Sequence, residues 1–208
     1  MRYRRVLILL VPGLLLAGCE SMNWKSPDDY FTHINVKPPS GSTVSVCHGY
    51  SCKYKTPVTF SPADLAEIGA QIKKGGAGAA GERRGIAFAI ALIERKVGKV
   101  AGTANDLGQL QLKLAGQRGQ QDCVDEATNT TGYLVMLKKH GLLKFHSVKQ
   151  PSGRGFFLDG RWQHFAAVVE DTGSGEAWAV DSWPKDNGKP PVILPLKTWL
   201  ADYDNYAA

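Results

Sequence analysis

The chain has 208 residues, of which 43% are hydrophobic and 21% are charged, so we expect one folded domain with an apolar core and no wholesale disorder. Its 25 Lys and Arg residues against 19 Asp and Glu residues give a net charge of +6. Arg2, Arg4 and Arg5 lie in a stretch with the character of a removable leader, and taking three charges from six leaves only +3. The remaining basic residues are scattered, which argues against a nucleic-acid partner.

Residues 1–18 have the layout of an export signal peptide. Their basic start is followed by an apolar run at residues 6–16, which is too short to span a bilayer comfortably. The run ends in Leu16-Ala17-Gly18-Cys19, which resembles the lipobox of bacterial lipoproteins. The resemblance implies cleavage before Cys19, attachment of diacylglycerol to its sulfur, and contact with the membrane through this lipid anchor. An ordinary secretory signal before a chance cysteine is the alternative, and either one exports the chain.

The residue after the cysteine bears on the location. Glu20 stands where an Asp would signal retention in the inner membrane, so we expect a protein of the cell envelope, anchored in the outer membrane and facing the periplasm. Residues 19–43 are polar and contain several prolines, and we expect a lipidated N-terminus and a flexible tether without a core. The folded domain is then expected over residues 44–208.

Export to an oxidising compartment makes disulfides possible. Cys47 and Cys52 are five positions apart, and Gly49 allows the tight reversal that would bring their sulfurs together, so we expect a disulfide-closed loop. A zinc site formed by these cysteines with His48 is the alternative, although no second ligand pair has the expected spacing. The disulfide leaves Cys123 without a partner in the folded domain, and an unpaired thiol in such a compartment suggests that its reactivity is used.

Two segments before Cys123 have the pattern of helices. Ser61 can cap a helix over residues 62–74, and Pro62 suits its first position. Residues 82–99 carry Ile and Val at helical spacing and are apolar nearly all round, which indicates a buried helix. The Gly- and Ala-rich residues 75–81 are expected to be a flexible connector, because no Gly-Lys-Ser/Thr follows as in a phosphate-binding loop.

A third helix is predicted over residues 123–139, capped by Asp122 and ended before Gly141. Beyond it the pattern is that of strands, at residues 143–149, 156–158, 162–170, 177–183 and 192–196. Helices followed by antiparallel strands predict an α+β domain in which the cysteine-bearing helix packs on an antiparallel sheet.

Cys123 at the first position of its helix would face unpaired backbone N–H groups and the positive end of the helix dipole. Both favour the thiolate over the thiol, and the same N–H groups can hold an oxyanion. On the helix, Cys123 shares a stripe with Ala127 and Leu134, so its sulfur is expected to point toward the sheet.

His164 and Asp181 lie on two predicted strands of one hairpin, in which residues two apart share a face. A two-residue turn at Thr172-Gly173 would place them directly opposite each other, and a four-residue loop over 172–175 would leave them diagonal on one face. A three-residue loop would separate them. The same face carries small Ala residues, so we expect it to receive the cysteine-bearing helix.

Cys123, His164 and Asp181 are the residue types of a catalytic triad. A thiol needs a base that removes its proton and later protonates the leaving amine, and the imidazole needs a carboxylate that fixes its tautomer. The candidate roles are therefore nucleophile for Cys123, base for His164 and orienting carboxylate for Asp181. The alternative is an ordinary strand histidine and a strand-end turn aspartate.

Three segments surround these residues: Asp122-Cys123-Val124-Asp125-Glu126-Ala127, Trp162-Gln163-His164-Phe165-Ala166 and Ala179-Val180-Asp181-Ser182-Trp183. Together they resemble bacterial transglutaminase-like cysteine proteinases, over about residues 86–200. The resemblance implies a papain-like fold, a Cys-His-Asp triad at the three positions above, and action on peptide or side-chain amides through a thioester. NlpC-type cell-wall peptidases share the residue order but typically have Asp-Cys-Ser-Gly at the cysteine, which Val124 and Asp125 fit badly.

No cofactor is expected. Some transglutaminase-like periplasmic proteinases bind calcium between acids on both sides of the cysteine, but Val124 follows Cys123 here, which argues against calcium. The side-chain donor of an oxyanion hole stays open among residues that precede the cysteine. These candidates are Asn105, Gln109, Gln120 and Gln121.

These observations predict an exported, lipid-anchored thiol hydrolase or acyltransferase that acts on peptide or glutamine-type amide bonds in an envelope protein or peptide. The alternative is a catalytically silent envelope lipoprotein that uses the same fold as a binding module. Hydrolysis and transamidation pass through the same thioester, so the sequence does not choose between them.

Overall fold

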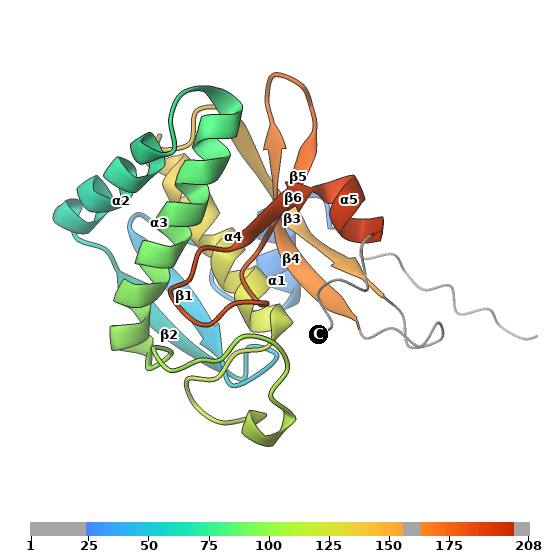
Figure 1. The fold of residues 1–208 in the computed structure, drawn as a ribbon. Coiled ribbons are helices and arrows are strands. Elements are labelled where there is room, and N and C mark those ends of the chain that lie inside the picture. Colours follow the sequence, from blue (N-terminus) through green and yellow to red (C-terminus); the bar gives the residue numbers. More distant parts are fainter. Residues whose placement is uncertain (1–23, 156–162, 202–208) are drawn as a thin grey trace, which may run out of the picture.

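The computed structural model describes residues 24–155 and 163–201 (Figure 1). The predicted signal peptide, the lipidation residue Cys19 and the predicted strand at residues 156–158 lie outside these ranges. Within them the chain combines α-helices with an antiparallel sheet, so the predicted α+β class is confirmed.

Most helices precede the main sheet along the chain. The elements are α1 (Pro27–His33), β1 (Thr43–His48), β2 (Tyr54–Thr59), α2 (Pro62–Lys74), α3 (Gly78–Ala101), the 3-10 helix η1 (Leu112–Leu114), α4 (Cys123–Lys139), β3 (His146–Arg154), β4 (His164–Asp171), β5 (Ala177–Asp181), β6 (Val192–Pro195) and α5 (Leu196–Ala201). β1 and β2 form an antiparallel hairpin, and the later strands form a four-stranded antiparallel sheet in the order β3-β4-β5-β6. Within the described ranges, no helix has both the length and the apolar character needed to cross a membrane.

The main core lies between α3, α4 and one face of the four-stranded sheet, as the arrangement in Figure 1 shows. Its most completely buried members include Ile90, Ile93, Leu134, Leu137, Ala167, Val169 and Val180. Full burial of one large aliphatic side chain stabilises a fold by about 1.5–3 kcal/mol. This layer therefore fixes α4, the helix that begins at Cys123, against the sheet.

The corner between α2 and α3 differs from the prediction. α2 has the predicted bounds and a capping box in which Ser61 and Asp64 accept each other's backbone N–H. α3, however, begins at Gly78, so the prediction of a flexible connector up to residue 81 is wrong for its second half. A Cβ at Gly85 would overlap the backbone of Ile72, so the glycines serve close packing of the two helices.

The prediction of a flexible tether up to residue 43 is also wrong for its described part. α1 places Tyr30 and Phe31 in buried positions, 2% and 1% exposed. They form a second apolar cluster with Val36 and with Val135 of α4. Aromatic side chains bury a large apolar area, and two of them hold this proline-containing segment on the domain.

The β1–β2 hairpin is absent from the predicted elements, although its sequence carries a signal. Val44 and Val46 alternate with polar residues, and both are buried in the main core. Pro57 in β2, which pairs with Ser45, interrupts the strand pattern there.

The bounds of the main sheet agree with the prediction for β4, β5 and β6 to within two residues. β3 begins later than predicted, at His146. The backbone N–H groups of Lys144 and Phe145 donate to the Glu82 carboxylate, so these residues bind α3 before the strand starts.

Candidate active site

The position of Cys123 follows from the cap of α4. The helix begins at Cys123, as predicted. Asp122 Oδ1 accepts the N–H groups of Val124 and Asp125, and the Asp125 carboxylate accepts the N–H of Asp122. This reciprocal capping box fixes where the first turn starts and therefore where the thiol lies.

The predicted bias of Cys123 toward the thiolate is wrong. Burial, helped by the carboxylates of Asp122 and Asp181, raises the pKa of its thiol to about 12. Asp122 also takes two N–H groups of the first turn, and its charge offsets the positive end of the helix dipole. With 8% of the residue exposed, Cys123 holds a neutral thiol whose chemistry requires a base.

His164 and Asp181 are hydrogen-bonded, with 2.7 Å between Nε2 and Oδ2. β4 and β5 pair Ala167 with Val180, so the hairpin has the register of the predicted four-residue loop, and the two residues lie diagonally on one face. Because Nε2 faces a carboxylate, we assign the ring proton to Nε2 and leave Nδ1 as an acceptor. Nδ1 is buried and has no hydrogen-bond partner among the described residues.

Two tryptophan rings enclose the His164 imidazole, with centroid distances of 4.5 Å to Trp183 and 5.5 Å to Trp199. Trp199 Nε1 also donates to Asp181 Oδ2 at 2.8 Å. Arg154 lies over the Trp199 ring, 4.3 Å from its centroid, and donates to the Trp199 carbonyl oxygen. The Asp181 carboxylate thus accepts from two buried donors, His164 and Trp199. Neither the bond from Trp199 nor the contact of Arg154 with Trp199 was predicted from the sequence.

The face that carries His164 and Asp181 packs on α5 and not on α4. Ala166 and Ala179, which share this face, form an apolar cluster with Trp199 of α5. The opposite face of β4 and β5 packs on α4 in the main core. The prediction that the small residues receive the cysteine-bearing helix is therefore wrong, because the large indole of Trp199 takes that space.

The sulfur of Cys123 lies at the beginning of β4. Its Sγ is 3.8 Å from the carbonyl oxygen of Gln163, and the backbone of Phe165 also bonds to it. These two residues flank His164, so α4 places the thiol beside the backbone of the histidine. The thiol is not hydrogen-bonded to the ring, because Nδ1 has no partner among the described residues. The structure therefore places the thiol beside the backbone of His164 and outside hydrogen-bonding geometry with its ring.

The candidate side-chain donors of an oxyanion hole lie in different places. Gln121 Nε2 donates to a carbonyl at the end of β1 at 3.3 Å, and Gln120 Nε2 donates to the carbonyl of Asn105 at 3.4 Å. The backbone N–H of Gln109 donates to the carbonyl of Trp183 at 2.8 Å. Gln109 is therefore the candidate whose backbone is bonded to a residue that covers His164.

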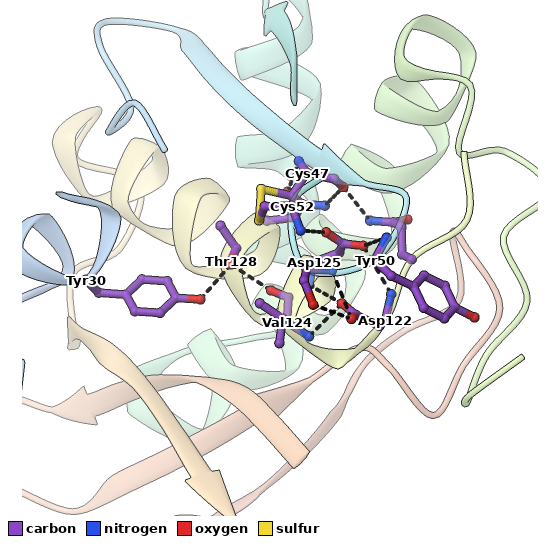
Figure 2. Close-up of a disulfide and its surroundings, with 11 residues drawn as sticks. Tyr30, Cys47, Tyr50, Cys52, Asp122, Val124, Asp125 and Thr128 are labelled. Atoms are coloured by element: carbon purple, nitrogen blue, oxygen red, sulfur yellow. Dashed lines mark hydrogen bonds between the residues drawn. A yellow bond between two sulfur atoms is a disulfide. The ribbon is translucent and has the colours of Figure 1, made fainter. Parts of the chain in front are cut away.

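The predicted disulfide between Cys47 and Cys52 is present at the tip of the β1–β2 hairpin (Figure 2). Both cysteines are buried. The alternative zinc site lacks its histidine, because both ring nitrogens of His48 are hydrogen-bonded elsewhere. The two sulfurs and the Asp125 carboxylate lie close enough to serve as ligand atoms, but the sulfurs are bonded to each other.

The turn closed by this disulfide has an unusual backbone. Residues 49–52 all have left-handed conformations, with φ of +86°, +69°, +51° and +54° in order. Glycine adopts this region freely, but each of the three residues after Gly49 is disfavoured there by about 1–2 kcal/mol. Such a run persists only where its surroundings hold it.

The first turn of α4 provides that hold (Figure 2). Asp125 Oδ2 accepts the N–H of Tyr50 at 2.8 Å, and Asp125 Oδ1 accepts the N–H of Cys52 at 2.7 Å. Asp122 Oδ2 accepts the N–H of Ser51 at 2.9 Å. Successive N–H groups in a turn form an anion-binding concavity, and here two carboxylates of α4 occupy it. Burial, helped by the charge of Asp122, raises the pKa of Asp125 to about 8.

Three further acids, Glu94, Asp106 and Glu126, are also buried, and Glu126 interacts electrostatically with the other two and with Asp125. Burial raises the pKa of Glu94 to about 8 and that of Asp106 to about 7, and it raises the pKa of Glu126 well above its usual value. The Gly188 N–H donates to Glu94 Oε2 at 2.8 Å, and the Gln121 N–H donates to Asp106 Oδ1 at 2.7 Å. None of these acids is distinguished in the sequence, because nothing local separates a buried acid from an exposed one.

A second buried histidine–carboxylate pair serves as a contrast. His146 Nδ1 lies 2.9 Å from Glu82 Oε1, and its Nε2 accepts a bond from Arg83 at 3.2 Å. Both ring nitrogens are engaged, so this pair joins β3 to α3 and has no free acceptor. His164 differs from His146 in that its second ring nitrogen, Nδ1, has no partner among the described residues.

Comparison of the chain with protein-family models, with curated proteins and with solved structures gives no match. The resemblance to transglutaminase-like cysteine proteinases therefore stays a prediction, and so does the papain-like arrangement. The α+β fold with its antiparallel sheet and the geometry around Cys123, His164 and Asp181 are the observations from which a function can be argued.

Proposed function

We propose that the protein is a thiol hydrolase or acyltransferase that acts on peptide or glutamine-type amide bonds, with Cys123 as nucleophile, His164 as base and Asp181 as orienting carboxylate. The observation that carries this proposal is the 2.7 Å bond between His164 and Asp181, which leaves Nδ1 buried and unpartnered among the described residues. A buried acceptor without a partner costs a fold about 1–3 kcal/mol. Retaining such an acceptor is understandable if it takes the proton of Cys123, whose sulfur lies beside the backbone that leads into His164.

The first step is proton transfer from the Cys123 thiol to Nδ1 of His164, which requires a movement that brings the two atoms together. Nε2–H stays bonded to Asp181, whose charge stabilises the imidazolium. The sulfur then attacks the amide carbonyl carbon, and negative charge moves to the carbonyl oxygen. The backbone N–H of Cys123 is a donor at hand for this oxygen, because the cap of the helix already takes the next two N–H groups.

The second half of the cycle releases the products. Nδ1–H of His164 protonates the leaving amine, the C–N bond breaks, and a thioester remains on Cys123. His164 then takes a proton from water or from an incoming amine, which attacks the thioester and breaks the C–S bond. Water completes a hydrolysis, whereas an amine completes a transamidation.

A binding module without turnover is the second candidate, and the state of the thiol favours it. The pKa of Cys123 is raised to about 12 by burial, and only 8% of the residue is exposed. In that case the His164–Asp181 pair serves to anchor Trp199, and with it α5, on the sheet. The two candidates differ in whether removal of the Cys123 sulfur abolishes a reaction.

The proposed location is the outer membrane, with a lipid anchor on Cys19 and the domain facing the periplasm. The disulfide between Cys47 and Cys52 supports export, because such bonds persist in oxidising compartments. Substrates would then be proteins or peptides of the cell envelope.

The test compares the wild-type protein with Cys123→Ala on a panel of envelope proteins and of peptides that contain glutamine, with and without an added amine. We expect cleaved or amine-linked products, read by mass spectrometry, from the wild type alone. Circular dichroism of both proteins controls for folding. Equal products from both, or none from either folded protein, would favour the binding module.

A further inference from the structure

The disulfide turn, residues 47–52, is bonded to the helix that carries the candidate nucleophile (Figure 2). Three successive backbone N–H groups of this turn donate to Asp122 or Asp125 at 2.7–2.9 Å. These two acids are the cap and the third residue of α4, and Cys123 is its first residue. Whatever holds the two carboxylates therefore also holds the backbone of Cys123.

The turn is anchored on the other side of its disulfide as well. Asn129 of α4 binds both polar backbone atoms of Cys47, with its Oδ1 2.7 Å from the amide nitrogen and its Nδ2 2.8 Å from the carbonyl oxygen. The Gly49 N–H donates to the carbonyl of Gln120, in the segment that leads into α4. The contacts thus join the turn to the first two turns of α4 and to the chain just before it.

The geometry of the turn depends on its closure. Three of its four left-handed residues are not glycine, and right-handed or extended conformations become accessible to them once the sulfurs are no longer joined. Their N–H groups would then turn away from the acids. Asp125, which is 0% exposed, would be left as a buried carboxyl group without two of its donors.

We propose that the disulfide turn is a clamp that holds the first turn of α4, and with it Cys123, in position, with Asp125 as the positioning residue that receives it. Reduction by a dithiol opens the clamp: the S–S bond breaks, two electrons and two protons pass to the sulfurs of Cys47 and Cys52, and the dithiol becomes a disulfide. The catalytic meaning of the clamp rests on the proposed function, whereas its effect on the thiol does not require turnover.

The test is the rate at which iodoacetamide alkylates Cys123 in the full chain at fixed pH, read on the Cys123 peptide by mass spectrometry. In the double variant Cys47→Ser/Cys52→Ser we expect this rate to rise by about tenfold or more, because the first turn of α4 opens locally. Asp125→Asn keeps the disulfide but has one side-chain oxygen for the two N–H groups that Oδ1 and Oδ2 of Asp125 accept, so its rate should also rise. Ser51→Gly is the matched control: glycine keeps the left-handed conformation and the N–H donor and loses only the 3.3 Å hydroxyl bond to Asp122, so its rate should stay within about twofold of the wild type.

Wild-type alkylation rates in both folded variants would overturn the clamp. Circular dichroism and the rate in urea identify a variant that has unfolded, and if the double variant unfolds, an unchanged rate in Asp125→Asn overturns the clamp by itself. The outcome is distinguishable from the fate of the proposed function. Fast alkylation in the variants of a protein that forms no products supports the clamp alone, and slow alkylation in a protein that does form products removes the clamp alone.

Discussion

At the residue scale, the asymmetry of His164 decides what the site can do. Its Nε2 is held by Asp181, while its Nδ1 is buried without a partner among the described residues. The same Asp181 oxygen accepts from Trp199, so the carboxylate is fixed by two donors and cannot easily rotate away. A histidine held in this way keeps one tautomer and offers one nitrogen as a base.

Asp181→Asn is therefore expected to lower kcat/KM by about a hundredfold or more while leaving the fold intact, because the variant is isosteric. His164 Nε2 and Trp199 Nε1 share one Asp181 oxygen, so the amide oxygen of the variant takes both bonds, and the negative charge that stabilises the imidazolium is lost. Turnover measures this loss, and the imidazole nitrogen resonances of His164 show that the ring keeps its tautomer. Activity within about twofold of the wild type would exclude Asp181 as the orienting carboxylate.

At this scale the sequence predicted that His164 and Asp181 share a face, but it did not predict the protonation state of Cys123. The alternation of side chains along β4 and β5 was enough to put His164 and Asp181 on one face. The thiol pKa of Cys123 was not accessible, because it is set by burial and by the charges of Asp122 and Asp181, which depend on tertiary packing.

At the scale of elements, α4 concentrates the candidate chemistry in its first turn and the packing in the rest. Asp122 as the cap and Gly141 as the end predicted the helix bounds, and the structure adds Asp125 as the second half of a capping box. Which face of the sheet α4 covers did not follow. That choice depended on Trp199 of α5, a residue far along the chain that needs the space beside Ala166 and Ala179.

Glu94 on α3 gives a pH dependence of stability. Burial raises its pKa from the usual 4.5 to about 8, so above pH 4.5 the folded chain keeps a proton that the unfolded chain releases. Stability from this group is full below pH 4.5 and declines as the pH rises through 8. Glu94→Gln keeps an acceptor for the Gly188 N–H and has no proton to lose, so it should lack this decline.

Urea unfolding near pH 5 and near pH 8 measures this effect. Relative to the wild type, Glu94→Gln should gain on the order of 1–3 kcal/mol in the free energy of unfolding between the two pH values. Glu176→Gln, at an exposed position, is the matched control and should follow the wild type. Parallel pH dependence in Glu94→Gln and the wild type would show that Glu94 does not hold its proton in the fold.

At the scale of the whole molecule, the two faces of the four-stranded sheet are covered by different helices. α3 and α4 build the main core on one face, and α5 closes the other face over His164 and Asp181 (Figure 1). Local periodicity was sufficient to predict α2, α4 and the last three strands. α1 and the β1–β2 hairpin were missed although both carry local signals: Ser26 caps α1 before Pro27, and Val44 alternates with polar residues in β1. Their positions depend on distant contacts such as that of Tyr30 with Thr128 of α4, 98 residues away in the chain.

The most direct measurement of the central claim, that Cys123 is a nucleophile served by His164, is acylation by a small active ester such as 4-nitrophenyl acetate. Intact mass after acid quenching, followed by peptide mapping, locates and times the acetyl group without knowledge of the natural substrate. We predict one acetyl thioester on Cys123 in the wild type, at least about tenfold slower acetylation in His164→Ala, and none at that position in Cys123→Ala. Equal acetylation rates of Cys123 in the wild type and in folded His164→Ala, or no acetylation of Cys123 in the wild type, would contradict the account.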